Sequence, residues 1–445
     1  MSSNAATIET LQKYLEDIRT DLYGRVLPFW MNHSVDEEYG GFFNNLDNDG
    51  SVFDTHKHIW LQGRQCWMFA RIANAFSSDE EFDAYVKKYN QNLPSQCTNI
   101  HTKAKVNPLP LTRSNLIKTA RAGVQFLRDH AVRKADGHIY FCLDRTGQPA
   151  LLQRKPFSAT FMIIALAEVG AATGEQILSD EAVDLLNRVL GWIKTPGSLG
   201  KEGLPGNPPL DPLNVPMIIL NIISELSRTI PMKSDTERNN FYKDERIWCS
   251  KEILKHVHAD KKVILESVRS DGSIDASTPE GRLINPGHAI EAGWFLLGYG
   301  QNEKNSELIQ QSLNVINWSW ELGWDTKYGN GGFLYFLDLE GFTPTQLEWN
   351  MKLWWPVAEA MVAMSMAYAE TLQTEYLEKF QLVTDWTFEH LCDKQYGEWY
   401  GYSDRHGKVT HQFKGGPYKG CFHVPRALFL CEQNLVTALK KLQEK

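Results

Sequence analysis

The sequence lacks an excess of basic residues and any long apolar run. Lys and Arg number 46 against 54 Asp and Glu, which gives a formal net charge of −8. Proteins that bind nucleic acid carry clustered positive charge, so we expect no nucleic-acid partner. The apolar stretches 161–167 and 360–369 end at Glu168 and Glu370. They are far shorter than the roughly 20 residues that cross a bilayer, so we expect no membrane span.

The sequence also lacks the usual signals of secretion, metal binding and phosphate binding. No basic segment followed by an apolar one opens the chain, which predicts a cytoplasmic protein. The seven cysteines include no Cys-x-x-Cys pair, which favours free buried thiols. His56 and His58, like His256 and His258, have a spacing that suits a metal on a strand, but no third ligand is apparent, so we predict no metal site. No G-x-x-x-x-G-K-[ST] loop is present.

What the sequence does contain is a short repeated pattern. An acidic residue is followed by Tyr-Gly, then by aromatic residues, then by Asp. Clear copies begin at Asp36, Asp325 and Asp393, a weaker copy begins at Asp136, and a degenerate copy begins at Ser270. Glycine beside alternating aromatic residues is typical of short strands joined by tight turns.

Helical stretches flank these copies. Amphipathic stretches at 11–31, 305–320 and 375–392 come before three of them. More hydrophobic stretches with few charges lie at 63–76, 158–173, 215–228, 286–299, 356–371 and 424–442. Because 445 residues divided by six is about 74, the chain fits six helix–loop–helix units with the hydrophobic helices inside.

Six such units can stack as an open solenoid or close into a ring, and a closed ring needs no polar capping repeats. We therefore predict an all-α fold, an (α/α)6 barrel formed as one domain over residues 1–445, with short β-hairpins at one mouth. The stretch 92–115 carries three prolines and little periodicity, and we predict a surface insertion or mobile loop there.

In such a barrel the first turns of the inner helices meet at one mouth. Equivalent positions there hold Arg64, His288, Glu359 and His423. This set suits proton transfer at carbon, because two histidines can serve the two faces of a planar enolate while a guanidinium stabilises its oxygen. Glu359 or Glu291 can orient an imidazole. The structural alternatives are that the histidines are hydrogen-bonding core residues and that Arg64 pairs with an acidic neighbour.

Four ordered motifs carry a resemblance to a known family. They are WLQGRQCW (60–67), NPGHAIEAGW (285–294), QLEWNMKLWWP (346–356) and KGGPYKGCFHVPR (414–426). With these motifs the chain resembles the N-acylglucosamine 2-epimerase family over residues 8 to 435. The resemblance implies the same (α/α)6 barrel and the interconversion of N-acetyl-D-glucosamine and N-acetyl-D-mannosamine through an enolate.

The resemblance also implies roles for particular residues. His288 and His423 form the acid–base pair, Arg64 stabilises the enolate, and Glu359 supports them. Further residues expected to bind the amino sugar are Trp60, Glu291, Trp355, Lys414 and Phe422. A homodimer, ATP or another nucleotide as an activator that is not consumed, and the protease renin as a partner are implied by the resemblance alone.

One position departs from the family pattern. In the family, the inner helix that corresponds to 158–173 usually opens with a polar residue, whereas this chain has Ala159. A 2-epimerase or isomerase for another sugar is therefore an alternative, as is a non-catalytic protease-binding protein. A glycoside hydrolase is less favoured, because it needs a pair of carboxylic acids, and here the set centres on imidazoles.

Overall fold

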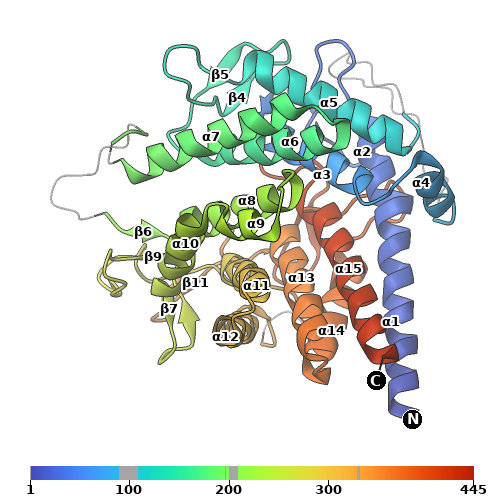
Figure 1. Cartoon of the computed structure of the whole chain (residues 1–445). Coiled ribbons are helices and arrows are strands. Elements are labelled where there is room, and N and C mark those ends of the chain that lie inside the picture. Colours follow the sequence, from blue (N-terminus) through green and yellow to red (C-terminus); the bar gives the residue numbers. More distant parts are fainter. Residues whose placement is uncertain (1, 90–108, 196, 200–208, 328–330, 445) are drawn as a thin grey trace.

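The computed structural model describes residues 2–89, 109–195, 197–199, 209–327 and 331–444. Within these residues, inner and outer helices alternate along the chain (Figure 1). The inner helices are α3 (Ile59–Ala73), α6 (Phe157–Thr173), α8 (Asn214–Thr229), α11 (Pro286–Asn302), α13 (Trp354–Thr371) and α15 (His423–Gln443). The outer helices are α1 (Ser2–Asp21), α5 (Arg113–His130), α7 (Gln176–Lys194), α10 (Lys243–Lys255), α12 (Ser306–Gly323) and α14 (Thr374–His390).

The inner helices contact one another in chain order, and α15 contacts α3, so they close into a ring. Each outer helix packs on an inner one, and the first outer helix, α1, lies along the last inner helix, α15 (Figure 1). The structure thus confirms the predicted (α/α)6 arrangement and the predicted inner helices. Shorter helical segments are η1 (Leu22–Val26), α2 (Leu27–His33), α4 (Asp79–Val86) and α9 (Asp235–Asn240).

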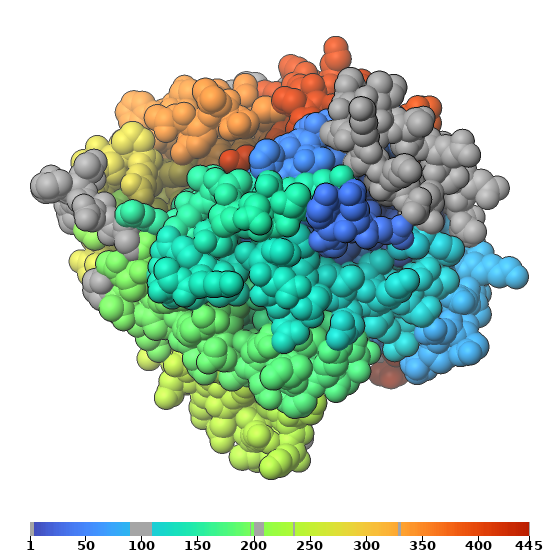
Figure 2. Space-filling model, turned by 90° about the horizontal axis from the view of Figure 1, so that it is seen from above, coloured from blue at the N-terminus to red at the C-terminus, as the bar shows by residue number. Residues whose placement is uncertain are grey.

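Hydrophobicity separates the two helix layers. In α6 all residues from Ser158 to Gly170 are buried, and in α13 nearly all residues from Trp354 to Ala369 are buried. Outer helices such as α5 bury one stripe of side chains and expose the other face. Figure 2 shows the surface on the side of the molecule that carries α5 and α7. An inner helix is covered on all sides, so a charged side chain is stable there only when another residue forms an ion pair or hydrogen bond with it. The few polar residues of the inner helices therefore indicate candidate functional sites.

Every strand among the described residues lies in a connection from an outer helix to the next inner helix, at the mouth that faces the inner-helix N-termini. Strands from neighbouring units pair: β3 with β4, β6 with β9, β10 with β11, and β12 with β13. The strands are β1 (Asn45–Leu46), β2 (Val52–Asp54), β3 (Lys57–His58), β4 (Cys142–Leu143), β5 (Pro149–Leu151), β6 (Asp211–Pro212), β7 (Val257–His258), β8 (Val263–Ile264), β9 (Ser267–Val268), β10 (Leu283–Ile284), β11 (Leu337–Asp338), β12 (Lys352–Leu353), β13 (Tyr402–Ser403) and β14 (Val409–His411). The predicted hairpins are thus present at one mouth.

The loop predicted at 92–115 ends earlier than expected. Residues 92–108 lie outside the described residues. Helix α5, however, begins at Arg113, so the last residues of the predicted loop are helical. Thr112 causes this start, because its side-chain oxygen accepts a hydrogen bond from the Asn115 backbone N–H (3.2 Å) and caps the helix.

Glycines in two hairpin turns lie against histidines at the ends of α2 and α5. Gly50, with φ of 84°, leaves no room for a Cβ against the His33 ring, and Gly147 has the same relation to His130. The positive φ and the close contact both require glycine. The two histidines therefore serve the packing of the hairpins on the helices.

Three hairpins share a buried ion pair that the repeated pattern encodes. The Nζ of Lys57 lies 2.9 Å from Asp36 Oδ2, and Lys352 and Lys414 make the same contact with the Asp residues that open the copies at 325 and 393. Each ammonium group also donates to a glycine carbonyl in its own turn. These lysine side chains are fully buried, so the ion pairs hold the hairpins on the barrel.

Lys414→Met tests this role. The change leaves the Asp393 carboxylate in a buried site without its cation, and we expect the free energy of unfolding to fall by about 3 kcal/mol. Urea unfolding of the whole chain measures it, with the exposed Lys408→Met as control. A variant as stable as the control contradicts the assignment.

Candidate active site

The ring brings the predicted catalytic residues to the mouth at which the inner helices begin. His423 and His288 lie in the first turns of α15 and α11, and Glu359 and Arg64 lie two turns or less into α13 and α3. The α11 start is fixed by Asn285, whose side chain accepts a hydrogen bond from the His288 backbone N–H (3.2 Å). Each side chain therefore points from a rigid helix end into the same space.

His423 is oriented by a buried carboxylate. Its Nδ1 lies 2.7 Å from Glu359 Oε1, and Glu359 is fully buried. Because a carboxylate only accepts, the hydrogen lies on Nδ1, and the neutral ring presents the Nε2 lone pair. The other carboxylate oxygen, Oε2, accepts a hydrogen bond from Trp294 Nε1 at 3.0 Å. Glu359 thus fixes both the tautomer and the direction of His423.

A second guanidinium neutralises the carboxylates. Arg426 Nη2 lies 2.5 Å from Glu359 Oε1 and 2.8 Å from Glu291 Oε1. Glu291, Glu359 and His423 offer donor atoms within 4.8 Å of one another, which is compact enough for a metal ion. The position between the two carboxylates is taken by Arg426, so the chain itself supplies the cation there.

His288 has its own carboxylate partner, on a different element. Its Nδ1 lies 2.9 and 3.0 Å from the two carboxylate oxygens of Glu266, which stands between β8 and β9. His288 is 28% exposed, whereas the side chain of Glu266 is 13% exposed. The imidazole is therefore held at Nδ1 and leaves Nε2 for the cavity.

The surroundings of the two histidines shift their pKa values in opposite directions. Burial, together with the positive charges of Arg64 and Arg426, lowers the pKa of His423 well below its usual value. Burial also disfavours the charged form of His288, but the charge and hydrogen bond of Glu266 outweigh it and raise the pKa of His288. His423 is therefore favoured as the neutral, basic imidazole, and His288 binds a proton more readily than an ordinary histidine.

Arg64 is a buried cation surrounded by aromatic rings. Its guanidinium carbon lies 4.1 Å from the ring centre of Phe161 and 4.6 Å from those of Trp60 and Phe422. Within the described residues Arg64 forms no ion pair, which excludes the alternative that it pairs with an acidic neighbour there, and its Nε has no hydrogen-bond partner. Burial and then Arg426 lower its pKa to about 9, so the group stays charged at neutral pH and is available to an oxyanion.

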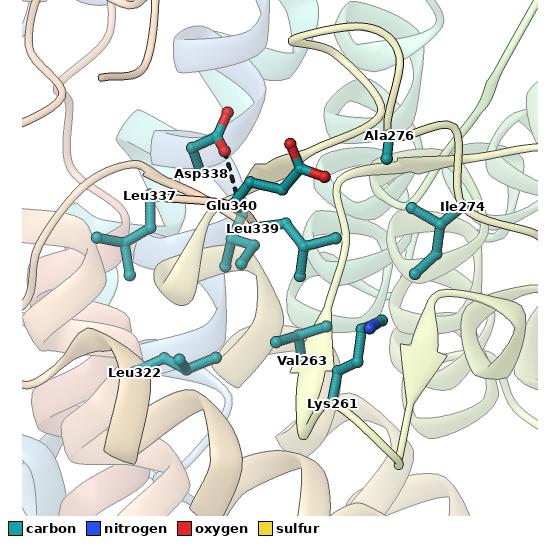
Figure 3. A pocket seen from close by; sticks show the side chains of 10 residues that line it. Lys261, Val263, Ile274, Ala276, Leu322, Leu337, Asp338, Leu339 and Glu340 are labelled. Atoms are coloured by element: carbon teal, nitrogen blue, oxygen red, sulfur yellow. Dashed lines mark hydrogen bonds between the residues drawn. The ribbon is translucent and has the colours of Figure 1, made fainter. Parts of the chain in front are cut away.

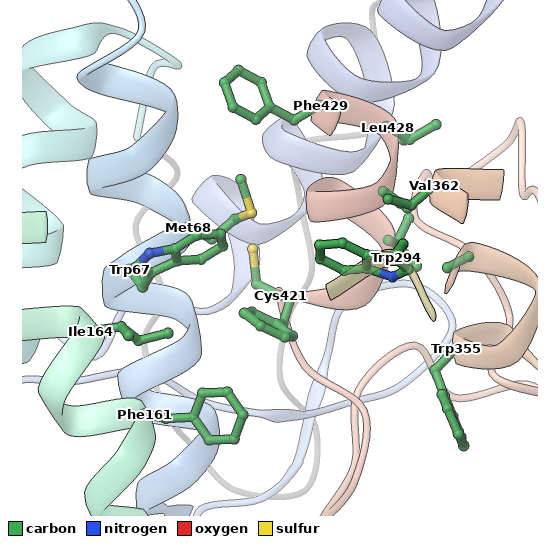
Figure 4. Close-up of a cluster of buried hydrophobic side chains, with 14 of the residues drawn as sticks. Trp67, Met68, Phe161, Ile164, Trp294, Trp355, Val362, Cys421, Leu428 and Phe429 are labelled. Carbon is green, nitrogen blue, oxygen red and sulfur yellow. The ribbon is translucent and has the colours of Figure 1, made fainter. Parts of the chain in front are cut away.

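Aromatic side chains form the walls of this space. The Trp355 ring centre lies 5.0 Å from that of His288 and 5.9 Å from that of His423, so Trp355 contacts both imidazoles. Phe422 packs on Trp67 and Phe161. Figure 4 shows Trp67 and Phe161 on one side, Trp294 and Trp355 on the other, and Cys421 between them.

Two of the predicted sugar-binding residues have other partners. Lys414 is fully buried and bound to Asp393 (2.7 Å), so its prediction as a substrate-binding residue is wrong. Its position in a glycine-rich motif beside His423 was misleading, because its long side chain turns into the hairpin. Glu291 is buried against Arg426, and it acts through that guanidinium.

Sequence reasoning missed Glu266 and gave Arg426 no role. Glu266 interrupts the apolar run Val-Ile-Leu at 263–265, and a carboxylate in a short buried strand region was the signal that could have found it. Arg426 lies three residues after His423 on α15, the spacing that places two side chains on one helix face.

Glu266→Gln tests the electrostatic setting of His288. Removing the negative charge leaves burial as the dominant influence, so we expect the pKa of His288 to fall. A proton NMR titration of the imidazole signals measures it, with His288→Asn to assign the resonance. Glu252→Gln is the control, because Glu252 pairs with Lys255 instead of a histidine. An unchanged pKa of His288 would contradict the proposed pairing.

Comparison with known proteins places the sequence in a family. The sequence matches the profile of N-acylglucosamine 2-epimerase (GlcNAc 2-epimerase) over residues 41–96 and 99–427. It is 39% identical over 438 residues to the N-acylglucosamine 2-epimerase of Mus musculus, covering 98% of this chain and 95% of that protein.

Two solved structures share the fold at lower identity. A cellobiose 2-epimerase from Bacillus thermoamylovorans has a TM-score of 0.72 and 19% identity and covers 95% of this chain and 99% of its own. A D-mannose isomerase has a TM-score of 0.69 and 19% identity, with coverage of 96% and 97%. The full-length sequence match decides the assignment: the chain belongs to the N-acylglucosamine 2-epimerase family, whose members are isomerases.

Proposed function

We propose that this protein interconverts N-acylglucosamine and N-acylmannosamine by moving the C2 proton of the open-chain sugar between two histidines. The observation that carries the proposal is the pair of imidazoles, each bound at Nδ1 by its own carboxylate, beside a guanidinium that forms no ion pair with the residues that the structure describes. A C2 proton is acidic enough to remove only when the oxygen of the adjacent carbonyl is stabilised as it gains charge.

In this proposal the directions of the two pKa shifts assign the roles of the histidines. Neutral His423 removes the C2 proton through Nε2, and the electron pair of the C–H bond moves to the carbonyl oxygen. Arg64 stabilises this enolate oxygen. Protonated His288 then delivers its proton to the opposite face of C2, which inverts the configuration. The return reaction uses the same groups in reversed roles, so each direction needs one proton on the pair.

The central experiment follows hydrogen exchange at C2. We expect N-acetylmannosamine in D₂O to epimerise with deuterium uptake at C2, as followed by NMR. His288→Asn and His423→Asn should each lower the epimerisation rate by roughly 10²–10⁴ with an unchanged circular dichroism spectrum. Near-normal turnover in either variant rules out the two-base assignment. A wild-type protein that binds the sugar without exchanging C2 hydrogen favours the binding-protein alternative, and exchange confined to another sugar favours an epimerase for that sugar.

Arg64 should matter for the rate more than for binding. Arg64→Gln removes the charge that faces the enolate oxygen, and we expect kcat to fall by roughly 10²–10³. Arg64→Lys should retain part of kcat, because it keeps the charge but loses the planar contact with three rings. Steady-state kinetics in both directions measure this. The control is Arg71→Gln, two turns along α3 and over Phe429; an equal loss there would indicate damage to the helix instead.

Three further proposals rest on the family resemblance, and a fourth, the cytoplasmic location, rests on the seven cysteines, which include no Cys-x-x-Cys pair. A nucleotide such as ATP activates the enzyme without being consumed, two copies form a homodimer, renin is a protein partner, and the protein is cytoplasmic. Assays and sedimentation with and without ATP, and a binding assay with purified renin, test the first three. Among the described residues, none of the helices is both long and apolar enough to span a membrane.

A further inference from the structure

Two cavities lie near the strand region that carries Glu266. The first, of about 570 Å³, lies between the hairpins and the end of α12, and its walls are mostly aliphatic (Figure 3). The second, of about 550 Å³, lies between α6, α7, α8 and α10 and includes residues 214–216 of α8 in its walls, and we call it the α8 chamber. His288, His423 and Arg64 are not among the residues that line the α8 chamber, so it is separate from the space into which the imidazoles present Nε2.

One wall of the α8 chamber carries a buried acceptor atom without a partner. The His256 ring is 2% exposed, and its Nδ1 lies 2.9 Å from the Leu265 carbonyl oxygen. A carbonyl only accepts, so the hydrogen lies on Nδ1, and burial lowers the pKa of His256 and favours the neutral ring. Its Nε2 is then an acceptor, and it has no hydrogen-bond partner among the residues that the structure describes. Because His256 lines the chamber, a molecule there can donate a hydrogen bond to this atom.

Carboxylates lie beside this acceptor. Asp211 and Glu266 line the chamber, and the negative charge of each acts on the His256 ring. Asp211 forms no ion pair within the described part of the chain. The charged residues of the lining are Asp211, Glu252, Glu266 and Glu280 against Lys155. The chamber therefore offers acceptors and negative charge, and it favours a ligand that brings N–H donors and a positive charge.

Other walls of the α8 chamber are aromatic and aliphatic. Phe157, Trp192 and Trp248 line it together with Val215. Trp192 is stacked on His138 with 4.5 Å between the ring centres, which holds the indole in place. The face of an indole ring attracts cations, and apolar walls stabilise the carbon body of an organic ion. These walls favour an organic cation over a hydrated metal ion.

We propose that the α8 chamber binds a small organic ammonium ion. Its N–H groups donate to Nε2 of His256 and to the carboxylate of Asp211, and its apolar body lies against Trp192 and Trp248. The volume of about 550 Å³ lies within the range of small-molecule pockets, which is roughly 300–1,000 Å³. The ligand is thus a different molecule from the sugar and has its own site.

The bound ion acts on the proposed reaction through Glu266, and this part of the inference rests on the proposed function. Glu266 lines the chamber while its carboxylate oxygens lie 2.9 and 3.0 Å from Nδ1 of His288. A cation in the chamber competes with His288 for this carboxylate. The other charged or titratable groups that act on His288 are Glu291, Glu359 and His423, and none of these three lines the chamber. The ligand therefore inhibits epimerisation without occupying the sugar site.

The binding test compares benzylammonium, benzyl alcohol and benzoate, which share an aromatic ring and differ in charge. Isothermal titration calorimetry of the whole protein at constant ionic strength should give benzylammonium a Kd at least about tenfold lower than the other two. Asp211→Asn removes one facing charge and should raise that Kd about tenfold. Val215→Phe fills the chamber and should also raise it.

The matched control is Ala276→Phe, which adds an aromatic ring to the cavity of Figure 3 and should leave the Kd of benzylammonium unchanged. Equal binding of the three probes overturns the proposed site. So does benzylammonium binding that neither Asp211→Asn nor Val215→Phe weakens.

Steady-state kinetics test the coupling through Glu266. With N-acetylmannosamine as substrate, saturating benzylammonium should lower kcat about tenfold and change KM by less than about twofold, because the ion and the sugar occupy different sites. Inhibition that competes with the sugar, or binding that leaves kcat unchanged, contradicts the coupling. If benzylammonium binds as expected to a protein that epimerises no sugar, the ammonium site stands and the proposed function is wrong.

Discussion

Closure of the inner-helix ring is the constraint on which the rest of the structure depends. The inner helices bury nearly every side chain, so an open stack would expose an apolar face at each end. The contact of α15 with α3, and of α1 with α15, covers those faces. The same contact places Arg64 against Phe422, two residues separated by most of the chain. Closure of the ring therefore completes the barrel and also brings Arg64 and Phe422 together at the candidate active site.

The centre of the ring holds charges that a hydrophobic interior would otherwise exclude. Two carboxylates, Glu291 and Glu359, are tolerated because Arg426 binds both. Glu359 also accepts hydrogen bonds from His423 at Oε1 and from Trp294 at Oε2. Replacing one partner leaves a buried charge uncompensated, so this network specifies a single arrangement. The network and the nearby guanidinium of Arg64 together favour the uncharged form of His423.

The strand region at the mouth supplies the carboxylate that raises the pKa of the second histidine, His288. His288 depends on Glu266, which comes from a strand region instead of a helix, and the repeated Asp–Lys pairs fix neighbouring hairpins to the barrel. The pKa of His423 is thus shifted by groups on the inner helices, and the pKa of His288 is shifted by a carboxylate at the mouth of the barrel. Two groups of the same type acquire pKa values on opposite sides of their common reference, which is what a two-base reaction requires.

The sequence by itself determined the number of units, the inner helices, the hairpins at one mouth and the presence of Arg64, His288, Glu359 and His423 there. Each follows from local periodicity, turn chemistry or position in a repeat, which neighbouring residues encode. Only the tertiary structure decided that Lys414 turns into a hairpin, that Arg426 bridges two carboxylates and that Glu266 holds His288. Those contacts join residues up to 135 positions apart, as in the pair Glu291 and Arg426, and their energy depends on burial, which exists only after the ring has closed.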